Sequence, residues 1–415
     1  MPRVARQLLL FIERRDHAIV VVLVTVVILL GLLYSTYLGN ELRYLPDEQD
    51  YYDLATSIAL RHRYSLDGER PTAYRPPGYP LFLSFSILLG ANIVHLRFLN
   101  FMALGLCIYL LYRILKKQSS QFAATLGAVF VVCYPVLFYT AGTLYPQTVA
   151  SLLFLLLIYL LTGNATSHRL PLLCGLLFGY LILTIPTFIF ALFVFAIWSW
   201  FSKKVVGAKE FSVTLATALL IIGAWCARNY MVFDTFVFVS SNSGENLLRG
   251  NSENTTPNAG VTVDISEYAT EAAQLNEIER DAYYRSKAIE FILGHKVHAV
   301  KLYVQKLLNY FNYRNELSTQ SEASSAKDFL MLVTYGPLLL LFVCRILLVK
   351  LFRPSAFETL LISLYVSSAL FAALFFTRIR FRLPFDFLLI MIVATFLRNA
   401  FRMWLGRFNA FPSTL

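Results

Sequence analysis

The stretch Ala18–Leu38, AIVVVLVTVVILLGLLYSTYL, decides the class of fold because its 21 residues include no charge. A helix of about 20 apolar residues spans the hydrocarbon core of a bilayer. Four arginines precede this stretch: Arg3, Arg6, Arg14 and Arg15. A signal peptide has a shorter apolar region and a small-residue cleavage site. The pattern therefore predicts a retained first transmembrane helix whose amino end lies in the cytoplasm.

Similar apolar runs recur along the whole chain. They lie near 96–112, 123–141, 145–162, 171–202, 211–227, 329–344, 355–376 and 383–397. Hydrophobic residues make up 57% of the chain and charged residues 15%, whereas an average soluble protein carries roughly a quarter charged residues. The composition excludes a soluble enzyme and predicts an all-α polytopic membrane protein.

The run at 171–202 is longer than one crossing needs, and Thr184-Ile185-Pro186 interrupts it. If it crosses twice, the short cytoplasmic segments hold 17 Lys and Arg against 8 in the short external ones. A single crossing gives 11 inside against 14 outside. Because basic residues collect on the cytoplasmic side, we expect two crossings here, about ten transmembrane helices in all, and both termini in the cytoplasm.

This topology divides the chain into three units. Residues 1–227 hold transmembrane helices 1–7 and an external loop at 39–80, residues 228–328 form a larger external segment, and residues 329–415 hold helices 8–10. The larger segment contains an amphipathic pattern with Val297, Val300, Val304, Leu307, Leu308 and Phe311 on one face. Such a face is typical of packing or of a membrane surface rather than of a ligand groove.

The net charge of +11 follows from the cytoplasmic bias in basic residues, so nucleic acid is not expected as a partner. All five cysteines lie inside apolar runs, and His295 and His298 form the only close pair among six histidines. These patterns predict neither a disulfide framework nor a zinc site. Whether a divalent metal takes part stays open.

The first external loop concentrates acidic residues directly after Pro46. They are Asp47, Glu48, Asp50 and Asp53. An adjacent Asp-Glu pair at a helix start can supply a general base and a ligand or orienting group near the bilayer surface, which makes Asp47 and Glu48 candidate catalytic residues. A solvated helix whose Asp50 and Asp53 face water would give the same pattern.

Two external stretches carry arginines in unusual positions. Residues 74–80, YRPPGYP, hold Arg75 on a backbone stiffened by three prolines. Between the last two helices, three arginines lie on the external side, against the positive-inside trend: Arg378, Arg380 and Arg382. The planar donor fork of arginine suits phosphate, so all four are candidate phosphate ligands. For the second group, pairing with Asp386 or with the external acids is the alternative.

Together these elements resemble the polytopic GT-C glycosyltransferases, in particular the bacterial branch similar to protein O-mannosyltransferases and to the aminoarabinose transferase of lipid A. The resemblance is carried by Asp47-Glu48, residues 75–80, residues 380–384, WCARNY at 225–230, SNSGENL at 241–247 and GN at 250–251. A further stretch extends the likeness over most of the chain, through Glu277, Glu279, Arg280, Asp281, Lys301 and Lys306.

The resemblance implies a hexosyl- or pentosyltransferase that moves a sugar, with inversion, from a polyprenyl-phosphate donor to a lipid, glycan or protein acceptor. It implies a site at the external, periplasmic face of a bacterial inner membrane. Asp47 matches the acid that serves as base, and Glu48 matches its neighbour. The element with Arg380 and Arg382 matches a region near the donor phosphate, and Arg75 and Arg378 are further candidate ligands of that phosphate. Further substrate-binding candidates are Tyr74, Arg228 and Asn229.

Two stretches depart from the pattern of these relatives. Relatives commonly carry an acid in the second external loop, whereas residues 143–148 read TLYPQT, which argues against a metal site or a shared base there. Many relatives have an Arg-Pro pair where this chain has Ile185-Pro186. The donor head group or the acceptor is therefore expected to differ from that of the better-known members.

Proteins of other classes share part of this pattern. A transporter or flippase would place ionisable residues near the bilayer midplane and show symmetry between halves, and neither feature is found in the sequence. A non-catalytic envelope assembly protein would not need Asp47. An acyl- or phosphotransferase at the external face would use the same charges, so only analysis of its product distinguishes it from a glycosyltransferase.

Overall fold

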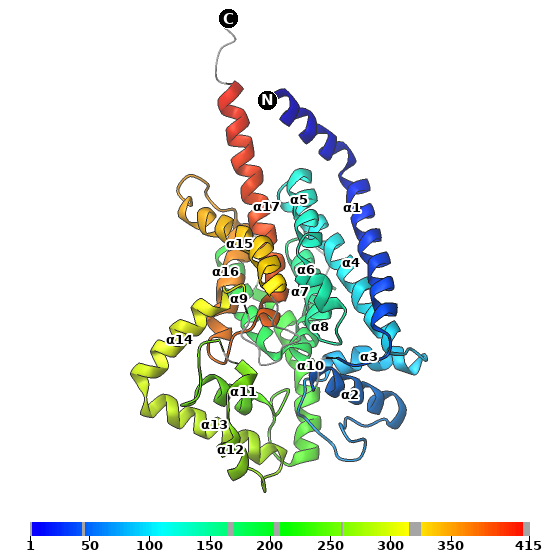
Figure 1. The fold of residues 1–415 in the computed structure, drawn as a ribbon, viewed down its shortest axis with the longest axis vertical. Coiled ribbons are helices and arrows are strands. Elements are labelled where there is room, and N and C mark those ends of the chain that lie inside the picture. The colour runs from blue at the N-terminus through cyan, green and yellow to red at the C-terminus, as the bar shows by residue number, and fades with distance from the viewer. Residues whose placement is uncertain are drawn as a thin grey trace, which may run out of the picture.

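The computed structural model describes residues 2–43, 46–163, 169–202, 208–258, 260–314 and 325–409. These residues form helices and connecting loops, with no strand among them (Figure 1). The all-helical class predicted from the sequence is therefore confirmed for this part of the chain. Residues 410–415, at the end of the expected unit 329–415, lie outside the described residues.

Four helices in the described ranges are long and apolar enough to cross a membrane. They belong to α1 (Pro2–Leu38), α4 (Ile93–Gln118), α10 (Ala208–Phe233) and α15 (Ser325–Leu347). A fifth crossing results if α5 (Gln121–Val132) and α6 (Pro135–Ala141), which meet at a bend of 61°, form one span. Proline lacks the N–H that a continuous helix would need at this bend. The chain is thus a multi-pass membrane protein.

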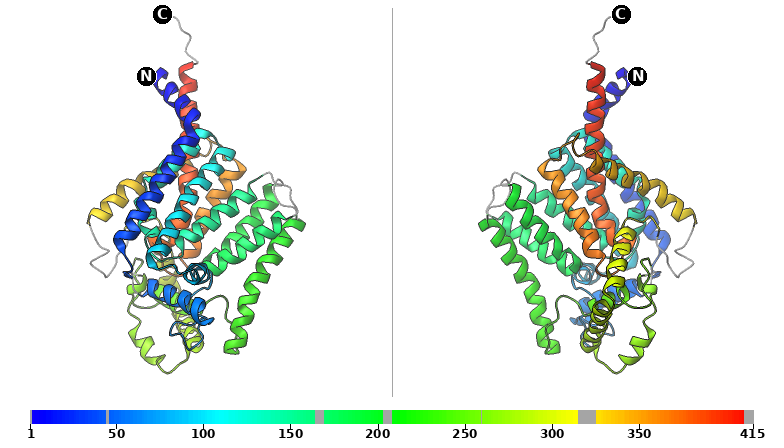
Figure 2. Two further views of the ribbon diagram at one scale, coloured as in Figure 1. Left: turned by 90° about the vertical axis from the view of Figure 1, so that its right-hand side faces the viewer. Right: turned by 90° about the vertical axis from the view of Figure 1, so that its left-hand side faces the viewer.

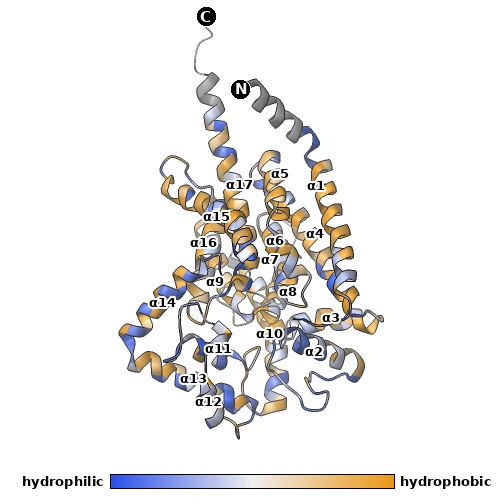
Figure 3. Cartoon of the chain, in the orientation of Figure 1, coloured by the Kyte–Doolittle hydropathy of each residue, from blue (hydrophilic) through white to orange (hydrophobic). Residues whose placement is uncertain are grey.

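The remaining apolar helices are shorter than a full crossing. They are α3 (Gly78–Leu88), α7 (Gln147–Leu161), α8 (Leu170–Thr184), α9 (Ile189–Ser202) and α16 (Ala356–Ala372). All but α3 coincide with apolar runs found in the sequence. Figure 3 shows the apolar residues of the bundle in orange, most continuously along α1 and α4. The expected total of about ten crossings stays a prediction.

The last helix, α17 (Ile379–Asn409), is the centre of the bundle (Figure 1, red). It packs against α5, α7, α15 and α16, and every residue from 382 to 394 is buried. Apart from the ion pair of Arg382 and Asp386, these residues are apolar on all sides of the helix, as is typical of a helix that other helices surround. The first residues of α17, Ile379, Arg380 and Phe381, are half-buried, so the helix begins at the edge of this buried region.

The break predicted at Thr184–Pro186 is confirmed and shapes the centre of the fold. After α8 ends, Ile185 adopts an extended conformation, and the short 3-10 helix η1 (Pro186–Phe188) leads into α9. The start of α3 lies against this break: a Cβ added to Gly78 would be 2.7 Å from the backbone nitrogen of Thr184. The Tyr180 hydroxyl also donates to the Gly78 carbonyl oxygen at 2.7 Å. The loop before α3 is thereby fixed beside the break.

The remaining elements gather at one end of the molecule. They are α2 (Asp47–Arg61), α11 (Ser243–Gly250), η2 (Gly260–Thr262), α12 (Ser266–Glu271), α13 (Glu277–Gly294) and α14 (Lys296–Tyr310). Leu248, Val263 and Tyr284 belong to a small hydrophobic core of their own in this region. Figures 1 and 2 show α1 beginning and α17 ending at the opposite end. This is the arrangement that an even number of crossings produces.

The amphipathic helix expected near 297–311 is α14, but its apolar face does not pack inward. Val297 is 87% exposed and Leu308 is 69% exposed, so these side chains do not pack against the protein, and a membrane-surface face stays a prediction. The helix instead buries Leu302 and Lys306. The Lys306 ammonium donates to the carbonyl oxygens of Gly250 and Phe375, each at 2.7 Å. Lys306 also donates to the Asn251 side chain. These three hydrogen bonds anchor α14 and leave its valines facing outward.

A buried ion pair joins α15 to α16. Arg345 donates to both carboxylate oxygens of Glu358, at 2.5 and 2.9 Å, and the two side chains are 1% and 3% exposed. Removing one partner leaves the other charge buried without compensation, which typically costs about 3–5 kcal/mol.

We predict that Glu358→Gln lowers the thermal unfolding midpoint of the detergent-purified protein, because Arg345 remains buried and charged. The double variant Arg345→Met with Glu358→Leu should recover much of the loss, since an apolar pair has no charge to desolvate. Asp328→Asn, which breaks the exposed pair with Arg314, is the control and should cost less than about 1 kcal/mol. Equal midpoints for Glu358→Gln and the wild type would contradict this interpretation.

Candidate functional site

The site is built on the first turn of α2, which begins directly after Pro46. Three acids lie in this turn, Asp47, Glu48 and Asp50. Carboxylates are favourable there because the first backbone N–H groups of a helix lack partners and carry partial positive charge. Successive helical residues are rotated by about 100°, so Asp47 and Asp50 share a face while Glu48 points elsewhere.

Asp47 is held between two arginines from distant parts of the chain. Arg75 Nη2 donates to Asp47 Oδ1 at 2.5 Å and to Asp50 Oδ2 at 2.7 Å. Arg380, in the first turn of α17, donates to Asp47 Oδ2. The three side chains of Asp47, Arg75 and Arg380 are 18%, 13% and 21% exposed. The structure therefore brings together three residues that the sequence singled out separately, and we call them the Asp47 triad.

The position of Arg75 is fixed on several sides. Its guanidinium lies 5.0 Å from the ring centroid of Tyr74 and 5.7 Å from that of Tyr51. The Tyr64 hydroxyl donates to the Arg75 carbonyl oxygen at 2.7 Å. Cation–π contacts and a fixed backbone restrict a long side chain that would otherwise sample many rotamers. The arginine is thus preorganised, as the three nearby prolines suggested.

The charges of the Asp47 triad set the proton affinity of its carboxylate. Burial acts to raise the pKa of Asp47, but the charges of Arg380 and Arg75 and their hydrogen bonds outweigh it and lower the pKa to about 2. In Asp50, burial dominates over the Arg75 charge and raises the pKa. Asp47 is therefore ionised at neutral pH and accepts a proton weakly while both arginines contact it.

The Asp47 triad opens on a cavity of about 590 Å³, here called the main cavity. One part is charged and is lined by Asp47, Arg75, Glu245, Arg249, Arg378 and Arg380. The other part is apolar and aromatic, with Ile185, Pro186, Phe188, Phe190, Phe371, Phe375, Phe376, Phe381 and Phe385. A cavity of this kind can hold a molecule with an anionic head and an apolar tail.

Glu48 does not line the main cavity, although the sequence suggested a catalytic role for it. Its side chain is fully buried, and it accepts hydrogen bonds from the backbone nitrogens of Arg43, at 2.9 Å, and Leu144, at 2.7 Å. Arg97 lies 4.0 Å from it. Glu48 thus joins the start of α2 to the loop at 143–148, where the sequence has no carboxylate of its own.

Arg382 also points away from the main cavity. It is completely buried, forms an ion pair with Asp386 at 3.0 Å, and donates to the carbonyl oxygens of Tyr310 and Asn312 at 2.7 and 2.9 Å. The pairing with Asp386 left open by the sequence is present. Arg378 and Arg380 line the main cavity instead. Arg378 precedes α17, and Arg380 lies two residues before Arg382 and therefore on a different face of the helix.

Of the other predicted substrate-binding residues, one lines the main cavity and two contact neighbouring loops. Tyr74 lines the main cavity, and its hydroxyl donates to Glu245 at 3.2 Å. Arg228 stacks on Trp225 and donates to the Thr72 carbonyl oxygen at 2.9 Å. The buried Asn229 donates to the backbone of residue 237. Arg228 therefore supports the loop that carries Tyr74 and Arg75, whereas Asn229 supports the segment after α10.

Sequence reasoning missed several residues of the site. Glu245 and Arg249 lie in or just after the SNSGENL stretch, which had no assigned role. Glu277 accepts hydrogen bonds from Thr72 Oγ1 at 2.6 Å, from the backbone nitrogen of Ala73 at 2.8 Å and from the Ser241 hydroxyl. The order of the motifs along the chain pointed to these stretches. It could not show which of their side chains line a cavity and which hold a loop in place.

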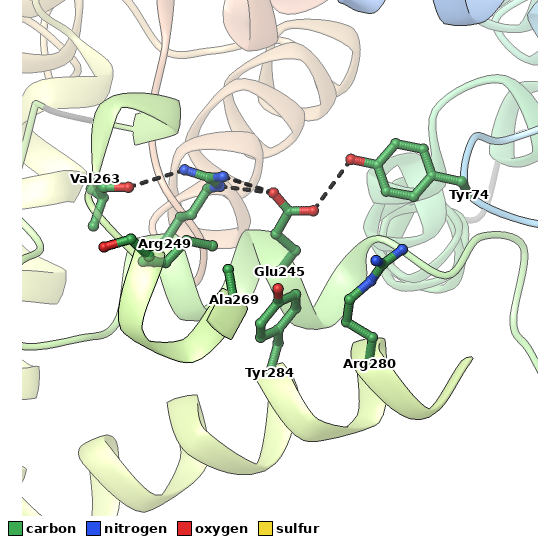
Figure 4. A pocket seen from close by; sticks show the side chains of 9 residues that line it. Tyr74, Glu245, Arg249, Val263, Ala269, Arg280 and Tyr284 are labelled. Carbon is green, nitrogen blue, oxygen red and sulfur yellow. Dashed lines mark hydrogen bonds and ion pairs between the residues drawn. The ribbon is translucent and has the colours of Figure 1, made fainter. Parts of the chain in front are cut away.

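A second cavity of about 470 Å³ lies beside the main one, on the side of α11, α12 and α13 (Figure 4). The two cavities share Tyr74, Glu245 and Arg249 in their walls. Within the described residues, no group of three or more His, Cys, Asp or Glu side chains is arranged to hold a metal ion.

Comparison with known proteins supports the resemblance inferred from the sequence. Residues 74–226, less than half of the chain, match the family model described as dolichyl-phosphate-mannose-protein mannosyltransferase. The comparison with curated protein sequences gives no match.

Solved structures give a similar result for the fold. The apo oligosaccharyltransferase from Archaeoglobus fulgidus has a TM-score of 0.51 and 17% identity, over 93% of this chain and 52% of that chain. ArnT from Cupriavidus metallidurans bound to undecaprenyl phosphate has a TM-score of 0.45 and 13% identity, over 92% of this chain and 78% of that chain. The chain thus spans about half the length of the oligosaccharyltransferase, with which it shares a fold. Residues 74–226 match the dolichyl-phosphate-mannose-protein mannosyltransferase family, and the predicted resemblance of the chain to polyprenyl-phosphate-sugar-dependent glycosyltransferases of the GT-C class is confirmed.

Proposed function

We propose that this protein is an inverting membrane glycosyltransferase that moves a sugar from a polyprenyl-phosphate donor to an acceptor at the external, periplasmic face of a bacterial inner membrane. The observation that carries the proposal is the Asp47 triad at the boundary between the charged and aromatic parts of one cavity. The family match supports it, because the family description names a lipid-phosphate sugar donor.

The two parts of the main cavity suit the two parts of such a donor. The phosphate would lie at Arg75, Arg378 and Arg380, where charge-assisted hydrogen bonds are available. The isoprenoid chain would lie along the aromatic wall formed by η1, the end of α16 and the start of α17. The break at Ile185-Pro186 contributes to this wall, so an Arg-Pro pair is not required to form it.

Asp47 is the proposed general base. It removes the proton from the acceptor hydroxyl or amine, and the freed electron pair attacks the anomeric carbon from the face opposite the phosphate. The bond from carbon to the phosphate oxygen breaks, and polyprenyl phosphate leaves with those electrons. Arginines at the leaving oxygen stabilise the charge that develops there.

Donor binding and base activation are coupled in this proposal, because both use the same arginines. With Arg75 and Arg380 bonded to it, Asp47 has a pKa of about 2 and is a weak base. A donor phosphate that draws these guanidinium groups away raises the proton affinity of Asp47. The base therefore becomes effective when the donor is in place.

The proposal includes the topology expected from the sequence: ten crossings, both termini in the cytoplasm, and external loops at 39–80 and 228–328 between the units 1–227, 228–328 and 329–415. The placement of α2 and α11–α14 at the end opposite the termini supports it (Figure 1).

For Asp47→Asn we predict a loss of about a hundred- to ten-thousandfold in sugar transfer, because an amide cannot accept the proton. The affinity for polyprenyl phosphate without sugar should be at least that of the wild type, since the arginines lose their carboxylate competitor. The measurements are transfer from a synthetic polyprenyl-phosphate sugar and equilibrium binding, both with purified protein. Asp53→Asn, outside the cavity, is the control. Normal transfer by Asp47→Asn would rule out Asp47 as the base.

For Arg380→Gln and Arg75→Gln we expect donor binding to weaken by about ten- to a hundredfold, the typical loss of one charge-assisted contact. Arg63→Gln, a substitution of an exposed arginine, should bind the donor normally. If both cavity variants bind as tightly as Arg63→Gln does, the phosphate lies elsewhere.

The topology can be measured with reporter fusions. A reporter after Leu415 should report a cytoplasmic location, and one inserted near Asn258 should report an external one, because basic residues favour that orientation. An external carboxyl terminus would contradict the two-pass interpretation of 171–202.

A further inference from the structure

The second cavity has no role in the reaction described above. It is formed by the external helices α11, α12 and α13 and by the loop after η2 (Figure 4). Its volume of about 470 Å³ lies within the range of roughly 300–1,000 Å³ typical of small-molecule sites. It has no aromatic wall like that of the main cavity, so it does not suit a polyprenyl chain. A different, more polar ligand fits it better.

The wall between the two cavities is a row of hydrogen-bonded side chains, Tyr74, Glu245 and Arg249. Arg249 Nε donates to one Glu245 oxygen at 2.9 Å, and the Tyr74 hydroxyl donates to the other at 3.2 Å. Arg249 also donates to the Val261 and Val263 carbonyl oxygens. The charges of Glu245 and Arg249 therefore compensate each other within the wall, as the dashed lines in Figure 4 show.

Arg280 contributes a solvent-exposed positive charge to the lining of this cavity. It lines the cavity from α13, and its guanidinium forms no hydrogen bond or ion pair with the part of the chain that the structure describes. The nearby Arg285, by contrast, is paired with Asp281. Tyr284 lines the same cavity one helical turn later, and its hydroxyl likewise has no hydrogen bond to the described residues. Two free donor groups thus face one small cavity.

We propose that the second cavity holds the acceptor, and that the acceptor carries a phosphate group bound by Arg280 and Tyr284. This inference rests on the proposed function. The planar fork of arginine and a phenol hydroxyl both donate to phosphate oxygens. Arg75 alone connects the wall of this cavity to the base, because Tyr74 in the wall stacks on Arg75 and Arg75 is bonded to Asp47. A phosphate at Arg280 would direct the rest of the acceptor across the Tyr74–Glu245 wall toward the anomeric carbon.

The test is equilibrium binding of two phosphate probes to the purified full-length protein. Glucose 1-phosphate represents a soluble phosphate, and phosphatidic acid in phosphatidylcholine nanodiscs represents a lipid headgroup. Arg280→Gln should bind the relevant probe about ten- to a hundredfold more weakly than the wild type, and Arg280→Lys should fall between them because it keeps the charge but loses the fork. Arg63→Gln is the matched control for loss of an exposed arginine.

The outcomes separate this inference from the proposed function. Loss of glucose 1-phosphate binding in Arg280→Gln assigns a soluble acceptor, and loss of phosphatidic acid binding alone assigns a lipid acceptor. Equal affinities of the wild type and Arg280→Gln for both probes would overturn the inference, as would an equal loss in Arg63→Gln. Polyprenyl phosphate binding should be unchanged in Arg280→Gln, and a loss there would place the donor rather than the acceptor at Arg280. Absence of sugar transfer by the wild type would overturn the proposed function, whereas normal transfer by Asp47→Asn would rule out only Asp47 as the base.

Discussion

One carboxylate between two guanidinium groups determines how three separate segments of this chain meet. The oxygens of Asp47 bond to Arg75 before α3 and to Arg380 at the start of α17, residues that are 28 and 333 positions away in sequence. An unpaired charge at this depth would be costly, so the start of α2, the proline-rich loop and the first turn of the central helix must assemble together. The main cavity is the space that remains around this contact.

The rest of the fold supports that arrangement through contacts of the backbone. Gly175 and Gly179 of α8 approach α10 so closely that an added Cβ would lie 2.6 Å from the Thr214 carbonyl oxygen and 3.1 Å from that of Ala218. Small residues permit this packing in membranes, where the hydrophobic effect adds little between helices. The break after Thr184 then admits the loop before α3, and Glu277 at the start of α13 holds that loop from the other side. Arg75 is therefore supported both by the bundle and by α13.

Features that depend on composition and local pattern could be predicted from the sequence. The direction in which individual side chains point could not. Apolar runs located the bundle helices, and proline located the break at 186, because these effects act over a few residues. Asp47, Arg75 and Arg380 stood out as charges in unfavourable positions. Glu48 and Arg382 looked equivalent to their neighbours, but a helix turns adjacent side chains in different directions. Glu245 and Arg280 could not be distinguished from other surface charges, since only the folded chain shows that both line a cavity.

The shared wall of Tyr74, Glu245 and Arg249 makes the two cavities thermodynamically dependent on each other. A molecule on one side that alters the Glu245 hydrogen bonds changes the surface presented to the other side. By linkage, the factor by which one occupant changes the affinity of the second must equal the factor by which the second changes that of the first. With two occupants, the order in which the cavities fill would leave the total binding free energy unchanged, and substitution of Glu245 would change the factor by which each occupant affects the other.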